Sequence, residues 1–262
     1  MIKQDNLGRL QLEGFVNRHD ARLDHIKVAV IGLGQAGGKM AQEFARVGIF
    51  TLALNTARTD LDDLKKIPEK NRIVIGTSGG ASKDIRIGRQ AILENKETVA
   101  NALQQEEIKD ADFVFVIAGL GGGTGNGGLP TLVNALSALR EHKRFKGKPT
   151  QGIIVSVPGD WEKRQLKRNA VAGIAALQKL IQSEKVGSVL IVDNQKLANE
   201  HKEKLSESSN LSWENYGNMA LASTIIETIV ATSLPQVNAF DRAEWLDVFS
   251  TPGFLTIGKR EH

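Results

Sequence analysis

The segment 118–128 reads AGLGGGTGNGG, and its composition indicates a loop that binds an anion. It lies between an apolar run at 112–118 and a predicted helix that begins at Leu129. So many glycines cost conformational entropy on folding, which makes sense where a backbone has to approach a ligand closely. Successive N–H groups and a helix amino terminus attract phosphates, and Thr124 and Asn126 add side-chain donors. The alternative is a glycine-rich surface turn; a Walker loop is excluded because no GK[ST] follows.

A second glycine turn, GLGQAGGK at 32–39, follows the first predicted strand. Its GxGxxG spacing is typical of dinucleotide-binding folds, in which an acid at the end of the second strand binds the ribose. Residues 55–58 read NTAR and contain no acid, although Arg58 keeps an NADP phosphate as an alternative. Two anion loops on neighbouring strands fit a nucleoside triphosphate better than a dinucleotide.

Asn55 and the segment 76–84 (GTSGGASKD) end two further strands, so we expect them to surround the same phosphates. For Gly79 and Gly80 an ordinary turn is the alternative. The predicted phosphate-binding residues are Gly34, Gln35, Ala36, Gly37, Gly38, Lys39, Asn55, Gly79, Gly80, Gly121, Gly122, Gly123, Thr124, Gly125 and Asn126.

Apolar runs and helical patterns alternate along the chain. Strands are predicted at 27–31, 51–55, 72–76, 112–118, 151–157 and 188–193. Helices are predicted at 36–47, 84–104, from 129 onward and at 161–183. This order predicts an α/β fold with a doubly wound parallel sheet, whose ligand lies at the carboxyl ends of the strands.

The alternation changes after the sixth strand. Residues 201–212 are predicted to be a polar connector, and a long helix follows from 212 until Pro235 stops it. A further helix is predicted at 241–249, and a strand at 251–258 is predicted to be the first strand of a further structural unit.

Composition restricts the class of protein. The 262 residues are 41% hydrophobic and 24% charged, as in ordinary globular proteins. No apolar run approaches the roughly 20 residues of a membrane span, and residues 1–25 lack the core of an export signal. The absence of cysteine excludes disulfides and thiolate chemistry, and five histidines show no ligand spacing, so we expect a cytoplasmic protein without a metal site of its own side chains.

The chain is mildly basic, with a net charge of +4. Basic runs at 142–148 and 163–168 are expected to be solvated faces, because no aromatic residues are interleaved with them as in a nucleic-acid site. We expect no direct binding of nucleic acid and no membrane contact.

The GGGTG core and its flanking residues resemble the signature of the tubulin/FtsZ GTPase superfamily, and the resemblance covers residues 26–258. The segments 158–160 (PGD) and 192–194 (VDN) look most like the plasmid- and phage-borne TubZ branch. An FtsZ-like cell-division protein is the alternative, although that branch more often has an aspartate where Ala57 stands.

The resemblance implies binding of GTP or GDP with Mg²⁺ and hydrolysis of GTP. Glu162 falls where the family places a glutamate on the ribose hydroxyls, and a carboxylate suits that task because it accepts two hydrogen bonds. Arg164 and Arg168 are both candidates for a nearby arginine, and Asn194 belongs to the base-side segment.

On the long helix, Tyr216 is placed to stack on a purine and Asn218 to read the guanine edge. Ordinary helix surface is the alternative for both residues, because single-residue matches are weak motifs.

Asp241 and Glu244 resemble the acidic loop that follows the central helix in this superfamily. There the loop completes the active site of the next subunit in a filament, so the resemblance implies catalysis in trans by positioning water. The same D-x-x-E spacing also suits the start of a helix, as a capping box.

The resemblance further implies a head-to-tail filament, a DNA-binding adaptor as partner and a role in plasmid or phage DNA segregation. Family members carry a second domain, so we divide the chain into an extension (1–25), a GTP-binding domain (26–200), a connector with the central helix (201–234) and the start of a truncated second domain (235–262). An NAD(P) oxidoreductase and a non-hydrolysing nucleotide-binding regulator are alternatives.

Overall fold

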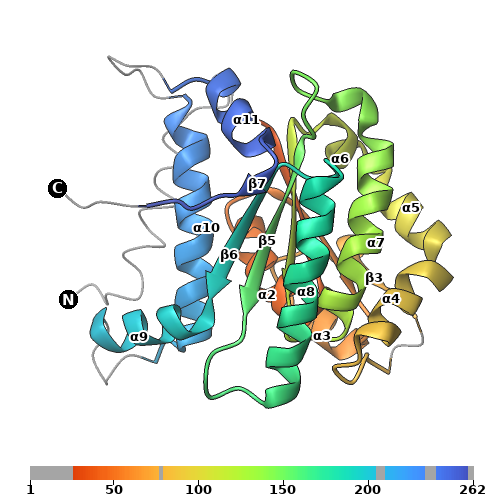
Figure 1. Cartoon of the computed structure of the whole chain (residues 1–262), viewed down its shortest axis with the longest axis vertical. Coiled ribbons are helices and arrows are strands. Elements are labelled where there is room, and N and C mark those ends of the chain that lie inside the picture. The colour runs from red at the N-terminus through yellow and green to blue at the C-terminus, as the bar shows by residue number, and fades with distance from the viewer. Residues whose placement is uncertain (1–25, 77–78, 205–209, 234–239, 259–262) are drawn as a thin grey trace.

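The computed structural model describes residues 26–76, 79–204, 210–233 and 240–258. Its strands form one seven-stranded sheet in the order β3-β2-β1-β4-β5-β6-β7, with every pair parallel and helices on both faces (Figure 1). The doubly wound parallel sheet predicted from the sequence is therefore confirmed.

The bounds of the elements are as follows. The strands are β1 (Val28–Leu33), β2 (Phe50–Asn55), β3 (Arg72–Val74), β4 (Phe113–Gly119), β5 (Gln151–Val157), β6 (Ser188–Asp193) and β7 (Gly253–Phe254). The α-helices are α2 (Gly34–Ala45), α3 (Arg58–Asp62), α4 (Ile85–Glu94), α5 (Lys96–Leu103), α6 (Glu106–Asp110), α7 (Thr124–Leu139), α8 (Arg164–Gln182), α9 (Asn194–Lys204), α10 (Trp213–Ala231) and α11 (Arg242–Ser250).

Two predicted helices differ from the observed ones. The helix predicted as far as 104 is two helices, because Asn95 leaves helical geometry (φ −110°, ψ 29°) and its side-chain amide bonds to the Ala91 carbonyl. The helix predicted from Leu129 begins at Thr124 instead, inside the glycine segment. The first turn of α7 is thus itself part of the glycine loop.

The C-terminal part also differs from the prediction. The stretch predicted as a connector from 201 is helical up to Lys204, where an ion pair with Glu200 one turn earlier supports α9. The strand predicted over 72–76 ends at Val74. Of the strand predicted over 251–258, Gly253 and Phe254 form β7 beside β6, and the Leu255 N–H donates to the Val189 carbonyl of β6 at 2.9 Å. The extension at 1–25 and the boundary at 235 lie outside the described residues.

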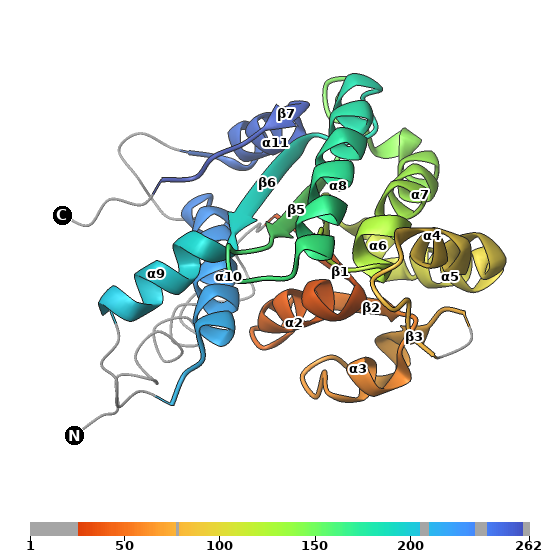
Figure 2. The same cartoon turned by 60° about the horizontal axis from the view of Figure 1, so that its bottom comes forward.

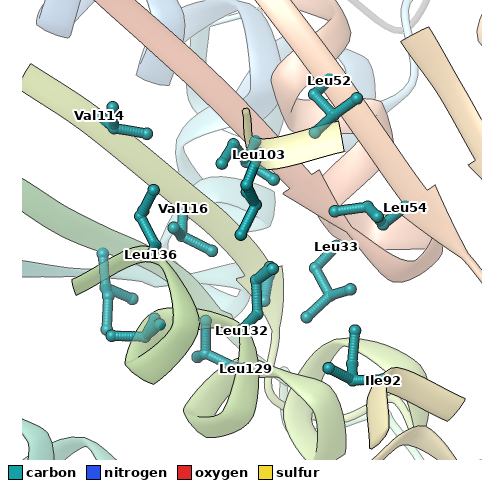
Figure 3. Packing of buried hydrophobic residues seen from close by; sticks show 14 of the residues in the cluster. Leu33, Leu52, Leu54, Ile92, Leu103, Val114, Val116, Leu129, Leu132 and Leu136 are labelled. Carbon is teal, nitrogen blue, oxygen red and sulfur yellow. The ribbon is translucent and has the colours of Figure 1, made fainter. Parts of the chain in front are cut away.

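The sheet is buried on both faces because side chains alternate along each strand. In β4, Val114 and Val116 face one layer, whereas Phe113 and Phe115 face the other. Helices α4, α5, α7 and α8 cover the first layer, where leucines of β1, β2 and α7 meet (Figure 3). Helices α2, α10 and α11 cover the second.

Helix α11 is joined to the second layer by aromatic packing. Trp245 is fully buried, stacks on Phe249 with ring centroids 4.0 Å apart and meets Phe113 edge-on at 5.3 Å. Its indole N–H donates to the Thr228 hydroxyl of α10 at 3.0 Å. None of the helices in the described part of the chain is long and apolar enough to cross a membrane.

Trp245→Ala is expected to lower the free energy of unfolding by about 3–5 kcal/mol, because it leaves a large cavity between α11 and β4. Urea denaturation followed by circular dichroism measures the change. Val171→Ala is the control, since Val171 is 73% exposed and its truncation is expected to stay within about 0.5 kcal/mol. Equal unfolding midpoints for the two variants would contradict the packing described for Trp245.

Candidate nucleotide site

The candidate site lies at the carboxyl ends of the strands, which point to the bottom of Figure 1 and come forward in Figure 2. Turns that follow β1, β2, β4, β5 and β6, together with residues 80–83, surround a cavity of about 540 Å³. A doubly wound sheet binds its ligand at this edge, and the volume suits a small molecule.

Glycine is required where the turn after β1 meets the segment after β4. Gly34 has a φ of +73°, and a Cβ on it would lie 2.8 Å from the backbone nitrogen of Gly125. A Cβ on Gly125 would lie 3.0 Å from the Leu33 carbonyl oxygen. The two backbones are therefore in direct contact. Because Gly123 and Thr124 line the cavity, the amino terminus of α7 opens into it and offers an anion site.

Polar side chains gather at the end of the cavity next to β2. The buried hydroxyls of Thr56 and Thr124 lie 2.7 Å apart. The two carboxylate oxygens of Asp60 accept amide hydrogens, one from Asn55 Nδ2 at 2.9 Å and the other from Gln35 Nε2 at 3.2 Å. Sequence reasoning missed Asp60, because it sought an acid directly at the strand end and Asp60 lies a helical turn further on, in α3.

The other end of the cavity is aromatic. Trp161 and Trp213 meet edge-on, with ring centroids 5.3 Å apart, and both line the cavity. Beside them, Glu162 Oε1 accepts hydrogen bonds from the Gly159 backbone at 3.0 Å and from Asn194 Nδ2 at 3.1 Å. The hydrogen bonds connect the turn after β5 to the start of α9. Neither tryptophan was among the predicted site residues, although Trp213 lies only one turn before Tyr216.

Most of the predicted nucleotide-binding residues converge on this edge. Those that line the main cavity are Gly34, Gln35, Ala36, Asn55, Gly80, Gly121, Gly122, Gly123, Thr124, Gly125, Glu162 and Asn194. Lys39 and Asn218 line an adjoining cavity of about 110 Å³, which shares Gln35, Asn194 and Trp213 with the main one.

Three predicted residues serve packing instead of lining either cavity. A Cβ on Gly37 would lie 2.2 Å from the Ile117 carbonyl oxygen, and one on Gly38 would lie 2.8 Å from Leu64 Cδ1. Both glycines thus let α2 approach its neighbours. The buried Asn126 donates its side-chain amide to the Leu120 and Asn169 carbonyls, at 2.8 and 2.6 Å.

Four more candidate residues line neither of these two cavities. Gly79 forms a bridge with Ala57. Arg164 begins α8 and lines neither cavity, nor does Arg168, whereas Leu166 between them lines the main one. Tyr216 faces α9 and donates its hydroxyl to Glu200 at 3.1 Å.

Tyr216 therefore lies in surroundings different from those of the residues that line the cavity. Burial, with the Glu200 carboxylate as a further cause, raises the pKa of Tyr216, so its phenol stays protonated as the donor to Glu200. The ring that faces the cavity from α10 is that of Trp213.

Asp241 and Glu244 lie at the opposite end of the sheet. Asp241 caps α11 by accepting the Glu244 N–H at 2.8 Å, and Glu244 accepts the Asp241 N–H at 3.2 Å, so the capping box is confirmed. Asp241 lines a separate cavity with Asp112 and Thr150, which directly precede β4 and β5. The two acids are therefore at the amino ends of the strands, whereas the glycine-lined cavity is at their carboxyl ends.

Fold and cavity together define a doubly wound α/β protein with a glycine-lined ligand site at the carboxyl edge of its sheet. The profile of the Tubulin/FtsZ family, GTPase domain, matches residues 27–202. The chain belongs to this family, which confirms the resemblance inferred from the glycine segment.

Two curated relatives cover most of the chain. The tubulin-like protein TubZ of Bacillus cereus is 28% identical over 251 residues, which are 90% of this chain and 55% of TubZ. The tubulin-like protein CetZ of Pyrococcus abyssi is 30% identical over 239 residues, 89% of this chain and 61% of CetZ. The chain thus spans little more than half the length of these relatives. The sequence motifs had not indicated the CetZ group.

Solved structures agree on the fold. A GTPγS-form protofilament of TubZ from Bacillus thuringiensis serovar israelensis aligns with a TM-score of 0.74 at 21% identity, covering 93% of this chain and 68% of TubZ. A GTPγS-bound protofilament of CetZ2 from Haloferax volcanii aligns with a TM-score of 0.68 at 25% identity, covering 87% of this chain and 64% of CetZ2.

Gly37→Ala is expected to destabilise the protein, because the new Cβ would lie 2.2 Å from a β4 carbonyl oxygen and push α2 off the sheet. We expect a loss of about 1–3 kcal/mol, the usual cost of overpacking. Gly79→Ala is the matched control, since a Cβ there meets nothing within 4 Å. Thermal unfolding of both variants without nucleotide decides the matter; an unchanged Tm for Gly37→Ala would contradict the packing role.

Proposed function

We propose that the chain binds GTP across the carboxyl edge of the sheet, with the guanine beside Trp213 and the phosphates over the glycine segment. The carrying observation is the order of the turns along the cavity. Trp213 of α10 lines the adjoining cavity together with Asn194, which follows β6. Trp161 and Glu162 lie in the turn after β5, and the glycine turns follow β4 and β1. Along the cavity from β6 to β1, these turns would contact first the base, then the ribose and then the phosphate chain of a nucleotide.

The proposal assigns the stacking role to Trp213 instead of Tyr216, because Trp213 lines the main and the adjoining cavity whereas Tyr216 lines neither. Asn218 lines the adjoining cavity, where its amide can read the edge of a base. Glu162 retains its second carboxylate oxygen for the ribose, since the Gly159 N–H and Asn194 Nδ2 both donate to Oε1. The family match to a GTPase domain supports guanine as the base.

The polar cluster at the end of β2 fits Mg²⁺. Asp60 offers a carboxylate oriented by Asn55 and Gln35, and Mg²⁺ prefers oxygen ligands. In the described part of the chain no three His, Cys, Asp or Glu side chains converge, which suits an ion that is held by one carboxylate, phosphates and water. Bound Mg²⁺ would neutralise phosphate charge during hydrolysis. Asp60 and Asn55 are the residues that would hold it.

We propose further that hydrolysis is completed in trans by Asp241 and Glu244. Both acids lie at the amino ends of the strands and cannot reach their own cavity at the carboxyl ends. Stacking a second copy head-to-tail would bring the acidic end of one subunit over the cavity of the next. The capping box fixes one oxygen of each acid and leaves the other to orient water.

Such stacking produces a filament, which is the assembly named for the TubZ and CetZ2 protofilaments. We propose a TubZ-like role in segregating plasmid or phage DNA, with a DNA-binding adaptor as partner and no direct contact with DNA. A cell-division role of the FtsZ type is the second candidate.

GTP and GDP are expected to stabilise the protein against heat, whereas ATP and NADP are not. Stabilisation follows RT ln(1 + [L]/Kd), which is about 2.7 kcal/mol at a hundredfold excess over Kd. Thermal shift across the four nucleotides with Mg²⁺ measures it. Equal shifts with ATP would remove the base assignment, and a shift with NADP alone would favour the oxidoreductase.

Glu244→Gln and Asp241→Asn are expected to lower GTP turnover about a hundredfold or more, the usual range for a general base. An amide oxygen still accepts the capping hydrogen bond, so the Tm and the Kd for GDP should stay unchanged. Glu97→Gln is the matched control, because Glu97 is an exposed acid that also lies in the first turn of a helix, α5. Phosphate release is the measurement.

Turnover per molecule of the unmutated protein should also rise with concentration, because each site needs two subunits. A turnover that stays constant over a wide dilution range would place all catalytic groups in one chain. That result would refute catalysis in trans, but it would not change the assignment of the nucleotide.

A further inference from the structure

Two buried asparagines, Asn126 of α7 and Asn169 of α8, lie behind the glycine segment (118–128). They are 5% and 4% exposed, and neither lines the main cavity or the adjoining one. A buried side-chain amide costs free energy unless it is hydrogen-bonded, so the partners of these two amides decide what their burial achieves.

Both amides donate to carbonyl groups of the glycine segment. Asn126 Nδ2 donates to the Leu120 carbonyl at 2.8 Å, and Asn169 Nδ2 donates to the Gly121 carbonyl at 2.9 Å. A carbonyl oxygen can only accept a hydrogen bond, so these contacts fix which end of each side-chain amide faces the segment. Two successive carbonyls are therefore held on the side of the buried asparagines.

The direction of each carbonyl also fixes the direction of the N–H that follows it. In a planar trans peptide, the C=O of one residue and the N–H of the next point in opposite directions. Because the carbonyls of Leu120 and Gly121 face the asparagines, the N–H groups of Gly121 and Gly122 point the other way. Gly121 and Gly122 line the main cavity, which lies on that other side.

The fold does not use these two N–H groups. In the described part of the chain, neither Gly121 nor Gly122 donates its N–H to another residue. Backbone N–H groups away from bulk water are nearly always paired, and successive N–H groups that face one side attract anions. The pair is therefore available to a ligand that carries negative charge.

The asparagines are themselves held in place. Asn169 Oδ1 accepts a hydrogen bond from Gln165 Nε2 at 3.0 Å, one turn earlier on α8, and its second amide hydrogen goes to the Lys83 carbonyl at 2.9 Å. Asn126 Nδ2 also donates to the backbone carbonyl of Asn169, at 2.6 Å. Gly173 leaves room for this contact, since a Cβ there would lie 2.6 Å from Asn126 Oδ1. The two helices are thus joined through the two side chains.

We propose that Asn126 and Asn169 are positioning residues of the nucleotide site, which orient the N–H groups of Gly121 and Gly122 toward the phosphate chain. Neither side chain touches the ligand, because each acts through the peptide group whose carbonyl it holds. Donors that are fixed before the ligand arrives need no ordering when it binds. This inference rests on the proposed binding of GTP.

Asn169→Leu tests the proposal, because leucine has nearly the shape of asparagine but cannot donate a hydrogen bond. GDP and guanosine are the probes, and titration calorimetry measures their affinities. We expect the affinity for GDP to fall about tenfold, because a hydrogen bond to a charged oxygen is lost, and the affinity for guanosine to stay within about twofold, because guanosine has no phosphate.

Asn71→Leu is the matched control. Asn71 is a similarly buried asparagine, 2% exposed, whose Nδ2 donates to the Thr51 carbonyl at 3.1 Å, and it lines neither cavity. We expect this variant to lower the Tm, as Asn169→Leu does, but to leave both affinities unchanged. The comparison separates a loss of stability from a loss of phosphate binding.

Equal losses of affinity for GDP and guanosine in Asn169→Leu would indicate general damage to the site, and an unchanged affinity for GDP would show that the amide does not orient the donors; both results overturn the inference. If Asn169→Leu does not fold, Asn169→Ser replaces it, because one short hydroxyl cannot hold both carbonyls, and the same outcomes apply. A wild-type protein that binds neither probe would refute the proposed function, and the inference with it.

Discussion

The structure depends on how closely backbones approach one another at the carboxyl edge of the sheet. The turn after β1 and the segment after β4 meet at Gly34 and Gly125, where a Cβ would collide with backbone atoms. The same segment meets α4 at Gly127, where a Cβ would lie 1.8 Å from the Ile85 carbonyl oxygen. Glycine at these places removes the side chains that would hold the turns apart, so N–H groups from several turns can face one cavity. The entropy that glycine costs in the unfolded chain is offset by the buried layers on both faces.

Much of this arrangement could be predicted because local sequence patterns indicate it. Apolar runs of strand length separated by helical patterns fixed the order of elements, and the parallel sheet then placed the turns after successive strands at one edge. The residues at that edge, such as Gly123, Asn55 and Glu162, could be found by their distance from a strand end. The start of α7 could not, because glycine disfavours helices and Thr124 begins one only in contact with its neighbours.

The remaining differences depend on contacts between distant elements. Asn126 looked like a donor to a ligand, but its amide is used by Leu120 and by Asn169, 43 residues further on. Tyr216 was predicted to stack on a base, but it lies against α9, a helix that the sequence analysis did not predict, and it donates its hydroxyl to Glu200 there. Trp213 and Asp60 face the cavity because of the rotation of α10 and the placement of α3, neither of which a motif fixes. Packing between elements distant in the sequence therefore determines where these four side chains lie.

The sheet also sets the distance between the two groups of functional candidates. Strand β4 begins directly after Asp112, which lines the same cavity as Asp241, and it runs to the glycine segment. Its seven residues span about 20 Å at roughly 3.3 Å per residue. Arg242 pairs with Asp112, whose other oxygen accepts the Lys27 N–H at 2.8 Å, so the start of α11 is fixed to the strand ends. Acids held in this way are separated from their own cavity by the length of a rigid strand. In the proposed mechanism a single subunit therefore carries both halves of the site at opposite ends of the sheet, and a second copy would bring them together.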